Sequence, residues 1–362
     1  MRKLYDVLQR FRPHFEEGGR LQSLKPVYDA TENFFFAPLA VTVETPHLRD
    51  ALDLKRFMAV VVVGLLPCLA AALHFFGLRV LAMIFVSYAV GGTIEVLFAI
   101  VRKEEINEGF LVTGLIFPLT LPPSLPLWIV AVGIAIGVVL GKELFGGTGR
   151  NPFNPALVGR CFLAIGYPAA MAGNWLKPGS GTLGRLAQYV DSSSIDAISS
   201  ATPLSAAKQG VFAGLPDLFW GNVAGSAGET SAIAILIGGI ILVVTRVASW
   251  RTVAGVLLSF ALLNAVLHHV DPGTFAPVLW NLCAGGLLFG AFFMATDPVT
   301  SPFTNGGKWA YGIIIGAVTL LIRSLTGYVE GVMFAILLGN IAAPLLDEAA
   351  VRIRLRRLSD EI

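Results

Sequence analysis

Residues 57–76 read FMAVVVVGLLPCLAAALHFF, a run without any Asp, Glu, Lys or Arg. A helix needs about 20 consecutive apolar residues to cross the hydrocarbon core of a bilayer. The whole chain of 362 residues has the same tendency, since 55% of its residues are hydrophobic and 14% are charged. A soluble domain carries about 25% charged residues. The composition therefore excludes an ordinary soluble enzyme and predicts a membrane protein with several spans.

Nine further runs have the composition of membrane helices, but several are shorter than a full span and contain Gly or Pro. Short, interrupted helices are typical of proteins that hold a binding site inside the membrane. We therefore predict an all-α membrane protein with about ten transmembrane helices, some of them broken. The runs that follow Phe57–Phe76 are Val80–Ile100, Phe110–Leu121, Trp128–Gly141, Ala156–Ala172, Ser231–Ala248, Thr252–Leu267, Leu282–Ala295, Tyr311–Leu325 and Gly331–Leu346.

Basic residues predict the orientation of these helices. With the N-terminus in the cytoplasm, eleven Lys and Arg residues of the short loops and the C-terminal tail lie inside and two lie outside, as the positive-inside rule requires. The chain then divides into a cytoplasmic segment (1–56), a first membrane half (57–172), an extracytoplasmic loop (173–230), a second membrane half (231–347) and a basic cytoplasmic tail (348–362). Each half has five helices, an odd number, so two repeats must be inverted relative to each other.

One carboxylate lies inside a predicted helix. Glu95 belongs to the second run, behind Gly91 and Gly92. A carboxylate at a helix centre costs about 2.5–3.5 kcal/mol on insertion scales, so it should face a partner or a water-filled cavity. Two interpretations remain open: an interfacial acid near Arg102, or part of an ion, proton or quinone site.

Four more polar residues lie at the breaks between runs. Asp297 precedes a proline where one run ends, and Asp347 ends the last run; capping or turn roles suit both. Asn151 and Asn154 also precede prolines, as turn residues often do. Inside a membrane protein, their carboxamides can instead pair with the edge of a heterocycle.

The sequence gives little sign of chemistry by the chain itself. It has no nucleotide-binding loop, and its three cysteines have no metal-ligand spacing. The net charge of +2 predicts no nucleic-acid partner. We predict no catalytic side chain. In the predicted outer loop, SSATPLS at residues 199–205 is a polar turn whose Thr202 hydroxyl can carry a phosphoester.

Several long motifs resemble those of one family. They are VRK at 101–103 with NEGF at 107–110, KELFGGTGRN at 142–151 and FMATDPV at 293–299. The chain resembles, over nearly its whole length, the NqrB family, the membrane subunit designated B in the Na⁺-translocating NADH:quinone oxidoreductases, which are the respiratory sodium pumps of bacteria. The RnfD subunit of the Rnf complex, a ferredoxin:NAD⁺ oxidoreductase, shares the motifs NPFNP, TDPV and ATPL. It also resembles this chain in the short link between the first two helices, where the sodium-pump subunit has a longer insertion. It lacks the N-terminal HFEEGG found here at 14–19.

The resemblance implies two flavin cofactors. The family carries FMN covalently, through a phosphoester to a loop threonine in a Ser/Asp-Gly-Ala-Thr motif that a flavin transferase modifies. Thr202 occupies that position, with Ser200 where the family usually has glycine. The family also binds riboflavin without a covalent bond, and the resemblance assigns that pocket to Asn151, Asn154 and Asp297.

The resemblance also implies a quinone site and a set of acids that handle Na⁺. The quinone residues are expected at Gly91, Gly92, Glu95, Phe34 and Phe36. The acids linked to Na⁺ correspond to Asp29, Glu95, Asp297 and Asp347.

The function expected from the resemblance is that of a subunit of a six-subunit bacterial inner-membrane enzyme, with both termini in the cytoplasm. Electrons from NADH arrive through partner subunits and pass by FMN and riboflavin to ubiquinone, coupled to Na⁺ export. Two alternatives remain open. One is the RnfD subunit of an Rnf complex. The other is a channel or transporter for small solutes, because inverted repeats with broken helices also suit permeation; such a protein would carry no flavin.

Overall fold

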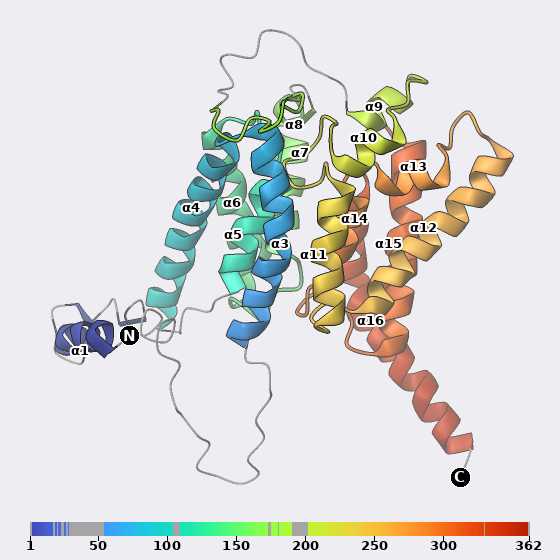
Figure 1. Ribbon diagram of the computed structural model, residues 1–362. Coiled ribbons are helices and arrows are strands. Elements are labelled where there is room, and N and C mark those ends of the chain that lie inside the picture. The colour runs from blue at the N-terminus through green and yellow to red at the C-terminus, as the bar shows by residue number, and fades with distance from the viewer. Residues whose placement is uncertain are drawn as a thin grey trace.

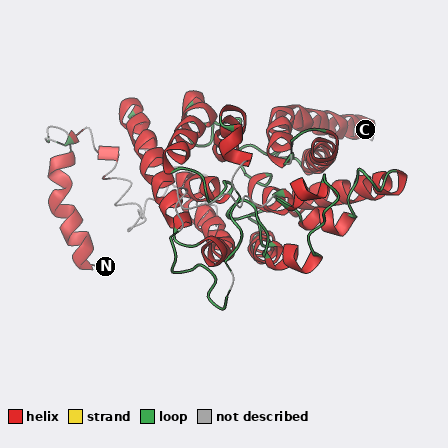
Figure 2. Cartoon of the chain, turned by 90° about the horizontal axis from the view of Figure 1, so that it is seen from above, coloured by secondary structure: helices red, strands yellow, loops and turns green. Residues whose placement is uncertain are grey.

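The structure is a computed structural model, and its described part consists of helices and loops. Figure 2, which views the molecule from above, shows helices in two neighbouring groups and no strand among the described residues. The prediction of an all-α membrane protein is confirmed. The described residues are 2–16, 19, 21–22, 25–26, 28, 54–103, 109–172, 175–179, 181–189, 202–328 and 330–360.

Six helices are long and apolar enough to cross a bilayer, and three shorter apolar helices accompany them. The N-terminal helix α1 spans Arg2–Phe15. The long helices are α3 (Leu54–Phe76), α4 (Arg79–Arg102), α6 (Leu127–Gly141, with the 3₁₀ turn that follows it), α12 (Trp250–Val270), α15 (Asn305–Leu325) and α16 (Val332–Asp360). The shorter helices are α5 (Gly109–Leu119), α7 (Pro155–Gly166) and α11 (Ala232–Val244).

All ten predicted runs are helical, but two of them are interrupted. The run predicted at Ala156–Ala172 is divided into α7 and α8 (Pro168–Ala172), because the residue before a proline avoids helical angles. The run predicted at Leu282–Ala295 begins at the end of α13 (Val278–Cys283), continues in α14 (Leu287–Phe289) and ends in a π-helical turn. Gly285, at φ +65°, separates α13 from α14, a conformation that glycine adopts readily.

The last helix is longer than predicted. Hydropathy ends the tenth run at Leu346, whereas α16 continues to Asp360 through the basic tail. Charged residues four positions apart stabilise such a helix, and Arg352 Nε lies 2.7 Å from Glu348 Oε1. The tail therefore continues a membrane helix beyond its apolar part.

The two halves repeat the same pattern of helix contacts. In the first half α3 contacts α5, α4 contacts α5 and α6, and α6 contacts α7. In the second half α11 contacts α14, α12 contacts the π-helical turn and α15, and α15 contacts α16. Figure 1 shows that α3 rises from the lower end while α11 descends from the upper end. This repeated pattern with opposite direction agrees with inverted repeats.

Two short helices lie at one end of the bundle. They are α9 (Pro203–Ala207) and α10 (Leu215–Trp220), and Figure 1 shows both at the upper end, opposite the C-terminus. Thr202, which precedes α9, is therefore at the end of the molecule away from the basic tail.

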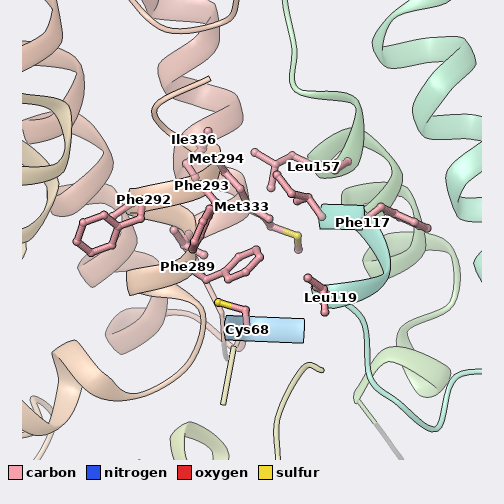
Figure 3. Packing of buried hydrophobic residues seen from close by; sticks show 14 of the residues in the cluster. Cys68, Phe117, Leu119, Leu157, Phe289, Phe292, Phe293, Met294, Met333 and Ile336 are labelled. Atoms are coloured by element: carbon pink, nitrogen blue, oxygen red, sulfur yellow. The ribbon is translucent and has the colours of Figure 1, made fainter. Parts of the chain in front are cut away.

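The centre of the bundle is an apolar contact between the halves. Figure 3 shows Cys68 of α3, Phe117 of α5 and Leu157 of α7 gathered with Phe289 of α14 and Met333 of α16. All five side chains are buried. Because lipid tails are as apolar as these side chains, close packing rather than water exclusion holds the helices together.

The close contact between α3 and α11 depends on two glycines, Gly64 in the first half and Gly238 in the second. A Cβ atom on Gly238 of α11 would collide with the backbone oxygen of Gly64 in α3. We expect Gly238→Ala to push the two helices apart and to lower stability by about 1–3 kcal/mol. Thermal unfolding in detergent measures this. The control is Gly166→Ala, whose Cβ would meet only Phe162, at 3.9 Å; equal melting temperatures for the two variants would contradict the prediction.

Candidate functional site

A pocket lies between the two halves, and we call it the interhalf pocket. Its volume is about 60 Å³. Apolar side chains from α3, α5 and α11 form its walls, and the polar breaks before α7 and α15 form one side. Its lining includes Phe57, Met58, Val61, Val112, Thr113, Ile116, Lys142, Thr148, Asn151, Asn154, Leu242, Val247, Phe293, Thr296 and Asp297.

Three residues predicted from the sequence meet in this pocket. Asn154 is the N-cap of α7, and its Oδ1 accepts a hydrogen bond from the backbone N–H of Ala156 at 3.0 Å. Asn151 is fixed by its neighbours, because its Nδ2 donates to the carbonyl oxygen of Phe153 at 3.0 Å. Asp297 accepts a hydrogen bond from Thr300 Oγ1 at 2.8 Å. Local turn chemistry therefore holds all three side chains at the pocket.

Lys142, the first residue of the motif KELFGGTGRN, also lines the interhalf pocket, although the motif alone predicts no role for it at a site. It follows the last residue of α6, is buried, and forms an ion pair with the buried carboxylate of Glu95. Thr148 Oγ1 lies 3.5 Å from the same carboxylate oxygen, and Thr148 lines the pocket too. Glu95 therefore contacts the pocket through Lys142.

Glu95 is buried and pairs with Lys142 and not with Arg102. Arg102 pairs instead with Glu143, with Nη1 and Oε2 2.8 Å apart. The basic residues at 102 and 142 thus form two adjacent ion pairs between α4 and the end of α6.

The two glycines predicted for the quinone site pack against one aromatic ring. A Cβ on Gly91 would lie 2.5 Å from Phe110 Cζ, and a Cβ on Gly92 would lie 3.4 Å from Phe110 Cε1. The Nζ of Lys142 lies 5.9 Å from the centre of that ring. Gly91, Glu95 and Lys142 thus belong to one cluster around Phe110. The predicted residues Asp29, Phe34 and Phe36 lie outside the described residues.

Asp347 has a structural environment of its own. Its Oδ2 accepts a hydrogen bond from the backbone N–H of Phe303 at 2.8 Å, and its Oδ1 accepts one from that of Thr304 at 2.8 Å. The hydroxyl of Thr304 donates a third. Asp347 therefore ties α16 to the break before α15. Nowhere in the described part of the chain do three acidic, histidine or cysteine side chains form a group suited to a metal ion.

Replacing Asp347 should weaken this link. In Asp347→Asn, an amide replaces one of two oxygens that face N–H and O–H donors, which we expect to cost about 1–3 kcal/mol of stability. Thermal unfolding of the purified chain checks the size. Glu348→Gln is the control, because Glu348 is the next residue along α16 and pairs with Arg352 on the exposed side of that helix. An unchanged melting temperature in Asp347→Asn would contradict the role.

Thr202 is the N-cap of α9, and its Oγ1 accepts a hydrogen bond from the N–H of Ser205 at 3.2 Å. It is 6% exposed and lines a small pocket that also includes Glu229, Thr230 and Glu330. Residues 199–201, the rest of the predicted motif, lie outside the described residues.

A buried charge cluster joins the halves below Thr202. Arg160 of α7 donates to Glu229 Oε1 at 2.9 Å and also pairs with Glu330, which lies just before α16. Such a pair is costly to break, because removing one partner leaves a buried charge uncompensated. No pattern in the sequence indicates this cluster, since Arg160 resembles an ordinary charge near the end of a membrane helix.

The chain is a polytopic membrane protein, because it combines long and interrupted membrane helices in two inverted halves. Its candidate site is the polar pocket between these halves. The chain belongs to the family described as NQR2, RnfD, RnfE, whose sequence profile matches residues 41–355.

Curated relatives cover nearly the whole chain. A protein of Azotobacter vinelandii is 40% identical over 97% of both chains, and one of Pseudomonas aeruginosa is 40% identical over 98% of both. One of Klebsiella pneumoniae is 39% identical over 98% of both. All three are named as the subunit designated B of the Na(+)-translocating NADH-quinone reductase. The resemblance to this family is therefore confirmed.

Proposed function

We propose that this chain is the flavin-bearing membrane subunit of a respiratory complex that passes electrons from NADH to ubiquinone and exports Na⁺. The observation that carries the proposal is the near full-length similarity to relatives named as a subunit of the Na⁺-translocating NADH-quinone reductase. The remaining subunits of that complex are its proposed partners. Its proposed location is the bacterial inner membrane, with both termini in the cytoplasm.

The interhalf pocket is the proposed riboflavin site. The carboxamides of Asn151 and Asn154 offer donors and acceptors that suit the pyrimidine edge of a flavin, and apolar walls suit its flat ring system. The flavin would supply redox chemistry that the side chains lack. A flavin bound in this pocket would lie between the break that carries Asn154 and the break that carries Asp297.

Thr202 is the proposed attachment point of FMN. Its hydroxyl suits a phosphoester, and as an N-cap it only accepts a hydrogen bond from Ser205, which an ester oxygen can also do. Because Thr202 is buried, attachment by a flavin transferase has to precede the packing of α9 or accompany its local opening.

Gly91, Gly92 and Glu95 are the proposed quinone residues that the structure describes. Phe34 and Phe36, which lie outside the described residues, complete the proposed set. The ion pair with Lys142 connects Glu95 to the wall of the interhalf pocket. Lys142 therefore holds a positive charge between the proposed quinone site and the proposed riboflavin site. A cation at this position would stabilise negative charge on a flavin or a quinone bound at these two proposed sites. Asp29, Glu95, Asp297 and Asp347 remain the proposed acids for Na⁺ handling.

A second candidate is the RnfD subunit of an Rnf complex. One observation favours it: only Gly77 and Leu78 separate α3 from α4, and the resemblance associates a longer insertion there with the sodium pump. The N-terminal motif HFEEGG at 14–19 favours the first candidate.

Purification of the tagged full chain from its native membrane distinguishes these functions. We expect an NADH-oxidising flavoprotein to copurify, and NADH:ubiquinone reduction to rise with Na⁺ concentration. A ferredoxin-type iron–sulfur subunit in its place would support the Rnf candidate. Protein without any flavin, from a host with a flavin transferase, would contradict both and favour a channel or transporter.

A further inference from the structure

A groove runs between the first turn of α15 and the tail of α16, at the end of the molecule that carries the C-terminus. Its volume is about 620 Å³, and we call it the tail groove. Phe303 and Thr304, in the break before α15, line it on one side. Leu346, Ala349 and Ile353 of α16 line it on the other. It shares no lining residue with the interhalf pocket, so it is a separate candidate site.

The tail groove lies where the apolar part of α16 ends. Hydropathy ends that part at Leu346, and the α16 residues that line the groove extend from Leu346 to Arg354. These two residues are eight positions apart, or about 12 Å of helix, whereas the headgroup region of one leaflet is about 5–7 Å thick. Figure 1 shows this part of α16 extending beyond the ends of the neighbouring helices. The groove thus spans the level at which acyl chains give way to headgroups.

The tail groove is continuous with an exposed apolar side of α16. Leu338, Ile341 and Leu345 have exposed side chains, spaced three or four residues apart and so on one face of the helix. The groove begins at the residue after Leu345, and its lining includes Phe303, 77% exposed, and Ile353, 56% exposed. Exposed apolar side chains that gather in one hollow mark a binding surface. An apolar ligand can therefore extend from the bilayer into the groove.

The charged side chain that lines the tail groove is that of Arg354. It forms no hydrogen bond or ion pair within the described part of the chain. Other groups compensate the two acids that precede it in α16. Glu348 pairs with Arg352. Asp347 accepts hydrogen bonds from the break before α15 and lies near the positive charge of Lys308. Arg354 therefore presents its positive charge to a ligand.

These features together select an anionic phospholipid. A guanidinium group binds the oxygens of a phosphate well, and basic residues beside a membrane helix attract anionic lipids. A small soluble anion would leave the apolar walls unused. A zwitterionic phospholipid carries an ammonium group that offsets its phosphate, so it gains less from Arg354. Asn305, in the first turn of α15, also lines the groove, and its amide can donate to a headgroup oxygen.

We propose that the tail groove binds one anionic phospholipid, with Arg354 binding its phosphate and an acyl chain packed along Leu346 and Ala349. The lipid belongs to the leaflet on the side of the basic tail. It would connect α16 with the break before α15, next to the hydrogen bonds that Asp347 makes across the same junction. The site is independent of the proposed flavin and quinone sites, since it uses none of their described residues.

Photolabelling of the full chain tests the site. The chain is purified from its native membrane with the subunits that accompany it, and phosphatidylglycerol with a diazirine in one acyl chain is added. Mass spectrometry then identifies the labelled peptides. We expect label within residues 303–310 and 346–354, displaced by unlabelled phosphatidylglycerol and much less by phosphatidylethanolamine. Arg354→Gln should raise the lipid concentration that gives half-maximal labelling about fivefold, because one basic residue at a membrane surface contributes that much to lipid binding.

Arg352→Gln is the matched control. It removes the same charge two residues away, but Arg352 pairs with Glu348 and does not line the groove. Its labelling should equal that of the unmodified sequence. An equal shift in both variants, or equal displacement by the two lipids, would overturn the proposal. Absence of label from both segments would overturn it too, and a cross-link between either segment and another subunit would then assign the groove to a protein contact.

Discussion

Thr202→Ala is expected to lose the covalently bound flavin completely while the chain still inserts into the membrane. The phosphoester needs a hydroxyl, and alanine has none. The structural cost is small, because the hydroxyl of Thr202 only caps the five-residue helix α9, and loss of a cap costs about 1 kcal/mol. Fluorescence of the band on a denaturing gel, together with intact-mass spectrometry, measures the loss.

Thr230→Ala is the matched control for this experiment. Thr230 is a buried threonine that lines the same small pocket as Thr202, and its hydroxyl has no hydrogen-bond partner in the described part of the chain. Its replacement should leave the band unchanged. A band that survives in Thr202→Ala would mean that the flavin is attached to another residue.

Lys142→Met is expected to destabilise the protein strongly and to abolish quinone reduction. The substitution leaves the carboxylate of Glu95 buried between α4 and α6 without its cation. Removal of one partner from a buried ion pair costs about 3–5 kcal/mol. Thermal unfolding of the purified complex should report this loss, and NADH:quinone reductase activity should fall with it.

The double variant Glu95→Gln with Lys142→Met separates stability from function. Removing both charges takes away the uncompensated carboxylate, so most of the lost stability should return. Quinone reduction should stay low, because the positive charge beside the interhalf pocket is still absent. Recovery of activity together with stability would show that the pair is only structural.

The helices could be predicted because their signal is local. The run at Phe57–Phe76 coincides closely with α3, and Pro168 and Gly285 lie at breaks that the high Gly and Pro content indicated in general terms. Hydropathy does not reveal that α16 continues to Asp360, since a charged helix and a charged coil have the same hydropathy. Ion pairs along one helix face, such as Glu348 with Arg352, decide that difference.

The candidate site could be predicted in part. Asn151, Asn154 and Asp297 are polar residues beside prolines in an apolar sequence, and they do meet in one pocket. A role for Lys142 could not be predicted, because a lysine at the end of a membrane helix is typical of a cytoplasmic boundary. Its partner Glu95 is 47 residues away. The positive-inside pattern likewise predicts that Arg323 is a charge of an outer loop, whereas its side chain is buried. A single sequence contains no signal for contacts at such distances along the chain.

The buried Arg160 and the partly buried Glu330 form an ion pair that connects the two halves. Arg160 belongs to the first half and Glu330 to the second, so sliding one half past the other would separate the carboxylate of Glu330 from the guanidinium of Arg160. A rotation about this point keeps the pair intact. Asn154 lies six residues, about 9 Å of helix, before Arg160. A rotation of one half about this pair would therefore move the wall of the interhalf pocket that carries the asparagines, while Arg160 and Glu330 stay in contact.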